Sequence, residues 1–185
     1  MSQDEHLPPG FVDIHCHLLP GLDDGPSNWS QTLAMAQAAV ENGLEWVVAT
    51  PHQRGRHAGN TPDVIRTLLD QARRQLEDRQ IPLKLFAGAD VRIDESLIDG
   101  LRNDEVQTIA GGRYLLLELP HDVYFPLDGL LRDLRHLGIM GILTHPERNH
   151  AIIRRPDLLE DVIRAGGLVQ ITAGSVTGAF GAVAR

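Results

Sequence analysis

The sequence predicts an α/β protein built on a parallel β-sheet that helices cover. Short apolar segments alternate with amphipathic segments of helical length along all 185 residues. The apolar segments are hydrophobic on both faces, which is typical of parallel strands with helices on both sides. A β/α barrel and an open, doubly wound sheet both fit this pattern.

The predicted elements follow one another with ordinary start and stop signals. Ser27 or Ser30 is the expected N-cap of the first helix, and Gly43 its stop. Thr61 and Pro62 open the second helix, since proline favours the first helical position. The expected strands cover residues 12–17, 44–50, 81–89, 113–119, 139–145 and 168–172. The expected helices cover residues 27–42, 62–79, a short segment from 94, 126–138 and 156–167.

Histidines and acids lie where the predicted strands end. They are His15 and His17 at the end of the first strand, Asp24 in the next loop, His52, Asp90, Glu118 and His145. Because the carboxyl ends of parallel strands meet on one face of a sheet, we expect these side chains to converge.

Imidazoles and carboxylates together are typical metal ligands, and the mixture suits zinc, manganese or iron better than calcium or magnesium alone. Seven candidates are too many for one ion, so we expect two or three ions that share a bridging carboxylate. Such clusters activate water and clamp the oxygens of a phosphoryl displacement. The alternatives are a hydrogen-bonded loop histidine for His52 and a turn-forming role for Asp23 or Asp24, which we favour for Asp23.

Three arginines are candidates for substrate binding. Arg148, in HPERNH at 145–150, could hold phosphoryl oxygens, because guanidinium matches phosphate bidentately. Its alternative is a salt bridge with Glu147 or with another carboxylate. Arg54 and Arg56, in QRGRH, could attract an anionic or phosphopeptide substrate, or they could be a solvated charge cluster. We interpret His6, His57, His121, His136 and His150 as surface residues.

Composition excludes several other classes of function. The formal net charge of −8 argues against general nucleic-acid binding. No dinucleotide fingerprint or P-loop follows the first strand. The first ten residues, MSQDEHLPPG, contain no apolar h-region, and no run approaches the roughly 18 apolar residues that a membrane helix needs, so we expect a cytoplasmic protein without membrane insertion. Cys16 is the only cysteine, and we expect it to be buried and inert.

The motifs, taken in order, resemble one family over residues 11–181. They are DIHCHLLPGLDDGP, TPH at 50–52, GADVR at 88–92, LELP at 117–120, HPERN at 145–149 and ITAGSVTGAFG at 171–181. The sequence is similar to the bacterial manganese-dependent protein-tyrosine phosphatases of the polymerase and histidinol phosphatase (PHP) superfamily, found in capsule and exopolysaccharide operons.

The resemblance implies a distorted, TIM-like β/α barrel that hydrolyses phosphotyrosine on a cognate tyrosine autokinase, using a hydroxide that divalent metals activate. The expected cofactors are two or three Mn²⁺ ions, with Fe, Zn, Co or Mg as alternatives. Motif by motif, it assigns His15 with His17 to one metal, Asp24 with His52 to a second, Glu118 with His145 to a third, Asp90 to the bridge, and Arg148 to phosphate.

The resemblance also implies two departures from the family pattern. Asp90 stands where the family usually has glutamate, and family members continue beyond Arg185 through a strand that bears Asp-x-His. We therefore expect a flexible tail at residues 1–10 and a single domain at 11–185 that lacks its last strand. An uncovered sheet edge would favour a homo-oligomer. Two other functions stay open: a histidinol-phosphatase-like or other small phosphomonoesterase, and an inactive metal-binding or kinase-binding protein.

Overall fold

The computed structural model describes residues 10–178, which divide into two compact units. The first unit runs to Ala89 and includes Gln107–Gly111, and the second comprises Asp90–Val106 and the residues from Gly112 onward. The predicted tail, Gly10 excepted, lies outside the described residues, as do His6 and the last three residues of the ITAGSVTGAFG motif. The single domain stays a prediction.

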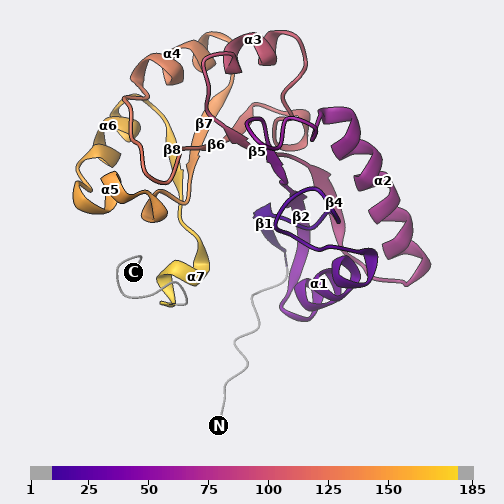
Figure 1. The fold of residues 1–185 in the computed structure, drawn as a ribbon. Coiled ribbons are helices and arrows are strands. Elements are labelled where there is room, and N and C mark those ends of the chain that lie inside the picture. The colour runs from indigo at the N-terminus through magenta and orange to yellow at the C-terminus, as the bar shows by residue number, and fades with distance from the viewer. Residues whose placement is uncertain (1–9, 179–185) are drawn as a thin grey trace. The chain divides into compact units, whose positions relative to one another are not determined.

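The first unit is a parallel sheet with two helices packed on it (Figure 1). Its strands β1 (Phe11–Cys16), β2 (Leu44–Ala49) and β4 (Lys84–Ala87) lie in the order β1-β2-β4. Helix α1 (Trp29–Glu41) packs against β2, and α2 (Pro62–Asp78) packs against β4 and against α1. The two-residue strand β3 (His52–Gln53) and the 3-10 turn η1 (Ile109–Gly111) complete the unit.

The helix boundaries test the predicted caps. Thr61 is the N-cap of α2, and Pro62 is the first residue of the helix, as predicted. The expected cap of α1 at Ser27 or Ser30 is wrong, because the Asn28 side chain accepts the hydrogen bond from Gln31 N at 3.1 Å. Asn28 has the extended backbone that an N-cap requires, and the Ser27 hydroxyl bonds to the Gln31 side chain instead.

The second unit repeats the same architecture with more, shorter helices (Figure 1). Its parallel strands lie in the order β5 (Asp90–Arg92), β6 (Tyr114–Glu118), β7 (Met140–Thr144) and β8 (Leu168–Gln170). Its helices are α3 (Leu97–Arg102), α4 (Asp128–His136), η2 (Pro146–Arg148), α5 (His150–Arg154), α6 (Leu158–Arg164) and α7 (Ala173–Val176). The centre of β6 is fully buried at Leu115, Leu116 and Leu117, as expected for a strand covered on both faces.

The predicted α/β class with parallel strands is confirmed, but several strand boundaries differ: β8 ends at Gln170 rather than 172, and β4 begins only at Lys84. The predicted strand 81–89 ends at Ala87 as β4, so Asp90 begins β5 rather than ending the earlier strand. Gly88, between the two strands, leaves no room for a side chain, because a Cβ there would lie 2.6 Å from Val48 Cγ1. Among the helices between residues 10 and 178, none has the length and apolar composition needed to cross a membrane.

Candidate metal centre

The end of β1 and the start of the TPH motif are held together by their backbones. Thr50 N donates to Cys16 O at 2.8 Å, and Cys16 N donates to the buried Thr50 hydroxyl at 2.9 Å. His15 and His17 flank Cys16, and His52 comes two residues after Thr50. These two bonds therefore fix the backbone from which three predicted ligands project.

Two imidazole nitrogens face each other at the end of β1. His15 Nε2 lies 3.3 Å from His17 Nε2. Nitrogens that share an ion, each about 2.0–2.1 Å from it, lie roughly 2.9–3.4 Å apart. The spacing of this pair is therefore that of two ligands of one ion.

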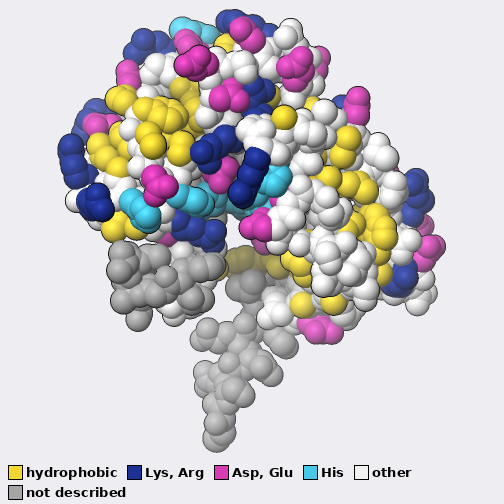
Figure 2. Space-filling view, viewed as in Figure 1, with side chains coloured by type: hydrophobic (Ala, Val, Ile, Leu, Met, Phe, Trp, Pro, Cys, Tyr) yellow, Lys and Arg dark blue, Asp and Glu magenta, His cyan; other side chains and the backbone are white. Residues whose placement is uncertain are grey.

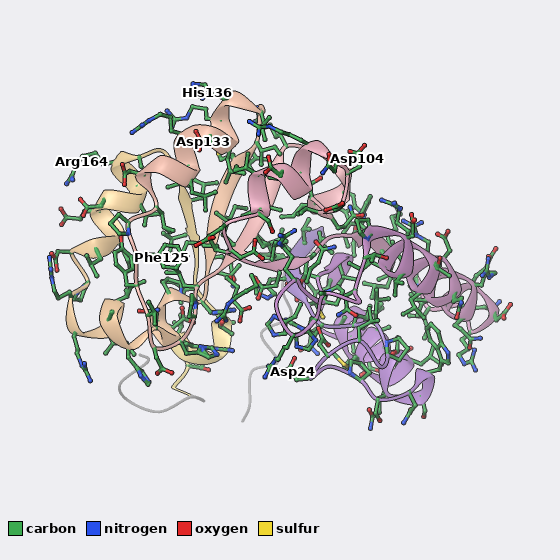
Figure 3. The ribbon with its side chains drawn as sticks, turned by 45° about the horizontal axis from the view of Figure 1, so that its top comes forward. Asp24, Asp104, Phe125, Asp133, His136 and Arg164 are labelled. Carbon is green, nitrogen blue, oxygen red and sulfur yellow. The ribbon has the colours of Figure 1, made fainter. Side chains whose placement is uncertain are left out.

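A second group of donors includes the same His17. One ligand atom each from His17, Asp24 and His52 lies within 4.8 Å of the others. Asp24 Oδ1 is 3.5 Å from His17 Nδ1 and 3.7 Å from His52 Nε2. Asp24 lies in the loop after β1, and its side chain is 76% exposed (Figure 3). The donor set of nitrogen and carboxylate oxygen fits a divalent transition metal by type.

Asp23 orients this group, and we did not predict this role from the sequence. Its side chain is fully buried, and Oδ2 lies 2.7 Å from His17 Nδ1 and accepts from His52 N at 2.8 Å. Burial opposes its charge, but the hydrogen bond and charge of His17 and the Gly25 and His52 backbone N–H groups outweigh it and lower its pKa to about 2. An ionised carboxylate only accepts, so His17 Nδ1 carries the proton and Nε2 presents its lone pair toward a metal.

Gly25 explains why the DDGP motif needs a glycine. A Cβ at this position would lie 2.6 Å from His17 O and 3.0 Å from Asp23 Oδ1. Gly25 N also donates to Asp23 Oδ1 at 2.9 Å, in the turn that we predicted for this aspartate. The Asp-Gly pair therefore brings the loop against His17 while Asp23 supports the imidazole.

The basic loop after His52 is anchored by Asn60. The Asn60 amide donates to Leu22 O at 3.0 Å and to His52 O at 2.7 Å, which joins the DDGP loop to the TPH motif. Arg54 adopts a left-handed conformation, with φ of 74°, at the turn of this loop. Arg56 is exposed, and its Nε donates to His57 Nε2 at 3.0 Å.

His57 contacts a predicted ligand, although we interpreted it as a surface residue. Its ring stacks on the His52 ring, with the centroids 5.3 Å apart, and its Nδ1 lies 3.3 Å from Leu22 O. No pattern in the sequence separates it from an exposed loop histidine.

The second unit brings together Asp90 and His145. Asp90 is fully buried, with Oδ2 3.2 Å from His145 Nε2, and its Oδ1 accepts from the Thr144 hydroxyl at 2.9 Å. His145 has a left-handed backbone, with φ of 33°, which is uncommon outside glycine and frequent at functional sites. His145 N donates to Gln170 O at 2.8 Å, so β8 anchors this conformation.

Glu118 is nearly buried at the end of β6 and has a cation nearby. Arg92 Nη1 lies 3.9 Å from Glu118 Oε2, on the neighbouring strand in register. A carboxylate in a run of leucines needs positive charge, and Arg92 supplies part of it. The sequence predicted the need for a cation but not this arginine.

Cys16 is half-buried rather than fully buried as predicted, but its thiol has the properties of an inert one. Burial, followed by the negative charges of Asp13 and Asp23, raises its pKa to about 12. A thiol in this state is a poor nucleophile, because the thiolate is the reactive form.

Three other histidines left out of the predicted site are exposed, although the ring centroid of one of them, His121, lies 6.2 Å from that of the predicted ligand His145. His136 ends α4 and projects away from the fold, as do Asp133 on the same helix and Arg164 on α6 (Figure 3). His121 and His150 are exposed, and His150 pairs with Asp122 at 2.9 Å. The interpretation of these three as surface residues is confirmed.

A pocket of about 410 Å³ lies beside α4 and α6, where apolar side chains gather on the face shown in Figure 2. Its lining includes Tyr124, Leu127, Leu158 and Val162 and contains none of the predicted ligands. Burial, then the charges of Asp161 and Asp128, raises the pKa of Tyr124, with Arg155 opposing them. The pocket therefore shares no residue with the predicted metal site.

The sequence matches a known family over almost its whole length. The family is described as "Capsular polysaccharide synthesis, CpsB/CapC", and the match covers residues 11–185. The tyrosine-protein phosphatase YwqE of Bacillus subtilis is 36% identical over 173 residues, which are 92% of this chain and 68% of that protein. CapC of Staphylococcus aureus is 35% identical over 172 residues, again 92% and 68%.

A solved structure supports the same relationship. It belongs to the crystal structures of YwqE from Bacillus subtilis and CpsB from Streptococcus pneumoniae, described as metal-dependent tyrosine phosphatases. It superposes with a TM-score of 0.90 at 34% identity and covers 94% of this chain and 71% of the other. The predicted PHP-type fold is thereby confirmed.

Proposed function

Because the chain belongs to the CpsB/CapC family of capsular polysaccharide synthesis, we propose that it hydrolyses phosphotyrosine in a protein substrate with the help of divalent metal ions. Its relative YwqE is a tyrosine-protein phosphatase, and so is CpsB of Streptococcus pneumoniae, at 25% identity over 164 residues. The proposed substrate is a cytoplasmic tyrosine autokinase whose phosphorylation state regulates capsule or exopolysaccharide synthesis.

The observation that carries the proposal is the convergence of His15, His17, Asp24 and His52 at the end of β1. We assign these four side chains of the first unit, and Asp90, Glu118 and His145 of the second, as ligands of two or three ions. Mn²⁺ is our first choice because mixed imidazole and carboxylate donors suit it. Fe, Zn, Co and Mg are the alternatives.

Bound metals would supply Lewis acidity toward phosphoryl oxygens and lower the pKa of water. The side chains of the protein orient the ligands and bind the substrate. Asp23 holds the Nδ1 proton of His17, Asp24 extends an exposed carboxylate toward the histidines, and the Arg148 guanidinium binds phosphoryl oxygens. Arg54 and Arg56 give the anionic substrate a basic loop beside His52. Asp24 and Arg148 are the proposed catalytic residues.

The test uses the metal-loaded chain with a phosphotyrosine peptide. His15→Ala and Arg148→Ala should each reduce metal-dependent turnover by about 100-fold or more, because a ligand or a phosphate contact is lost. His136→Ala is the matched control, since it removes an exposed imidazole at the end of α4. Unchanged turnover in both site variants would rule the proposal out.

A panel of monoesters distinguishes the substrate classes. Phosphotyrosine peptides should be hydrolysed faster than phosphoserine peptides and histidinol phosphate at equal concentration. A preference for histidinol phosphate would instead assign the chain to small-molecule phosphomonoesterases with the same metal ligands.

A homo-oligomer stays a further proposal. Within the described residues β1 is an edge strand, and its Phe11, Val12 and Ile14 are 41%, 41% and 37% exposed. Apolar edges favour self-association. Sedimentation velocity over a range of concentrations measures it, and a monomer at every concentration would refute it.

A further inference from the structure

Glu147, immediately before Arg148 in the HPERN motif, is bonded to the segment that begins α7. Its Oε1 accepts hydrogen bonds from Thr172 N at 3.0 Å and from the Ser175 hydroxyl at 2.8 Å. Ser175 is fully buried. Hydrogen bonds to an ionised acceptor are stronger than neutral ones, so Glu147 holds the segment 172–175 firmly against η2.

Asn149, immediately after Arg148, is anchored just as tightly. Its Oδ1 accepts from Ala151 N and Ile152 N as the N-cap of α5. Its amide donates to Pro120 O at 2.7 Å and to Val123 O at 3.0 Å, and the residue is 3% exposed. Arg148 therefore lies between two neighbours whose side chains are both held by two or more hydrogen bonds.

The Arg148 guanidinium contacts the same residue that Glu147 fixes. Arg148 Nη2 lies 3.4 Å from the Thr172 hydroxyl, a long bond that depends on where Thr172 stands. The Thr172 backbone N–H is the one that Glu147 accepts. A shift of Thr172 would therefore move the hydroxyl against which the guanidinium rests.

The carboxylate of Glu147 is not arranged for stability alone. Its Oε2 is buried and has no hydrogen-bond partner among residues 10–178. An unsatisfied buried oxygen costs free energy, whereas an ion pair with the adjacent arginine would have satisfied it. The carboxylate bonds instead to Thr172 and Ser175 through its other oxygen, Oε1.

We propose that Glu147 is a positioning residue, which fixes Thr172 and through it orients the Arg148 guanidinium for the phosphoryl group. The proposal rests on the role that the proposed function gives to Arg148. In this proposal Glu147 acts through the adjacent Arg148 and does not itself contact the substrate.

A double-mutant cycle on the metal-loaded full chain tests this role, with kcat and KM measured on a phosphotyrosine peptide. Glu147→Ala should reduce kcat/KM by roughly 10–100-fold, while Glu147→Gln, which keeps the Oε1 acceptor, should stay within about threefold of the parent. In an Arg148→Ala background, Glu147→Ala should change kcat/KM by less than about twofold, since residues that act as a unit are not additive. Glu160→Ala, on the exposed face of α6, is the matched control.

Equal effects of Glu147→Ala with and without Arg148 would overturn the proposal, because a merely structural glutamate would weaken both backgrounds alike. Thr172→Val covers the case in which Glu147→Ala fails to fold. It removes the hydroxyl but keeps the backbone N–H for Glu147, and it should lower kcat/KM only when Arg148 is present. Full kcat/KM in Thr172→Val would equally contradict the proposal.

Amide hydrogen exchange separates this proposal from the proposed function, because it needs no turnover. Glu147→Ala should speed exchange in peptides covering 145–149 and 171–176, whereas Glu147→Gln should not. A parent chain without phosphatase activity would refute the proposed function and, with it, the catalytic purpose of the positioning. Exchange that is unchanged in Glu147→Ala would refute the positioning itself, whatever the activity.

Discussion

The thiol of Cys16 lies between two predicted metal ligands, and its pKa of about 12 determines what it can do. A thiol with so high a pKa is almost entirely protonated near neutral pH, so we do not expect Cys16 to act as the nucleophile of a cysteine-dependent phosphatase. Cys16→Ser should therefore keep at least about half of the parent turnover. Loss of turnover to the level of His15→Ala would contradict this prediction.

Alkylation measures the same property directly. Iodoacetamide should modify Cys16 slowly in the folded chain near neutral pH and rapidly in concentrated urea, where burial no longer raises the pKa. The chain has no other cysteine, so the mass shift reports this position alone.

Asp23 determines which nitrogen of His17 faces a metal, so its substitution should weaken metal binding without removing a ligand. Asp23→Asn should lower the affinity for Mn²⁺ or Zn²⁺ by about 10–100-fold, the usual effect of losing a carboxylate behind a ligating histidine. Titration calorimetry measures it. Asp63→Asn, in the exposed first turn of α2, is the control. Equal affinities in all three chains would show that Asp23 only shapes the turn.

Among the elements, β7 and α4 approach so closely that one glycine limits their packing. A Cβ on Gly141 would lie 2.6 Å from Leu117 Cδ1 and 2.8 Å from Leu131 Cδ2, both in the core. Gly141→Ala should therefore lower the free energy of unfolding by roughly 1–3 kcal/mol through overpacking. Because β7 leads directly into His145, the variant should also lower metal affinity.

Gly129, on α4 itself, is the matched control for Gly141. Nothing lies within 4 Å of a Cβ built there, and alanine favours the helix, so Gly129→Ala should stabilise the chain by about 0.5–1 kcal/mol. Urea denaturation measures both variants. If both changed the stability in the same direction, the close approach of α4 and β7 would not explain the requirement for glycine.

For the molecule as a whole, the fold was predictable because its signals are local and repeated. Apolar strands and capped helices alternate, so the α/β class, the parallel strands and the boundaries of α2 agree with the sequence pattern. The errors lie where several neighbouring residues could each form the same cap, or where a strand is only a few residues long. Asn28 and two serines compete for one cap, and Asp90 begins a three-residue strand that hydrophobicity cannot separate from β4.

The candidate site was predictable by residue type but not by its supporting contacts. Strand-end position identified His15, His17 and His52, and their grouping with Asp24 in the first unit agrees with that expectation. Asp23, Asn60 and Arg92 could not be assigned, because a buried support and a turn-forming or surface polar residue have the same sequence signature. Which of the seven predicted ligands bind an ion stays a prediction.

Metal binding should stabilise the whole chain, since an ion that binds only the folded state shifts unfolding by mass action. At about 100 times its dissociation constant, one ion adds about 2.7 kcal/mol, which corresponds to a rise in Tm of roughly 5–10 °C for a chain of this size. Removing metal with a chelator should reverse the rise, and Mn²⁺ should restore it. Differential scanning calorimetry in moderate salt measures the change, because salt screens loose attraction of cations to a chain of net charge −8.

His17→Ala and His136→Ala distinguish a specific site from general cation binding. His17 belongs to both donor groups of the first unit, so its loss should abolish most of the metal-induced rise in Tm. His136 is exposed at the end of α4, and its loss should leave the rise intact. Ca²⁺, which prefers oxygen ligands, should stabilise the parent chain less than Mn²⁺ does. An equal rise in Tm with His17→Ala would mean that the ion binds elsewhere, and the ligand assignment at the end of β1 would be wrong.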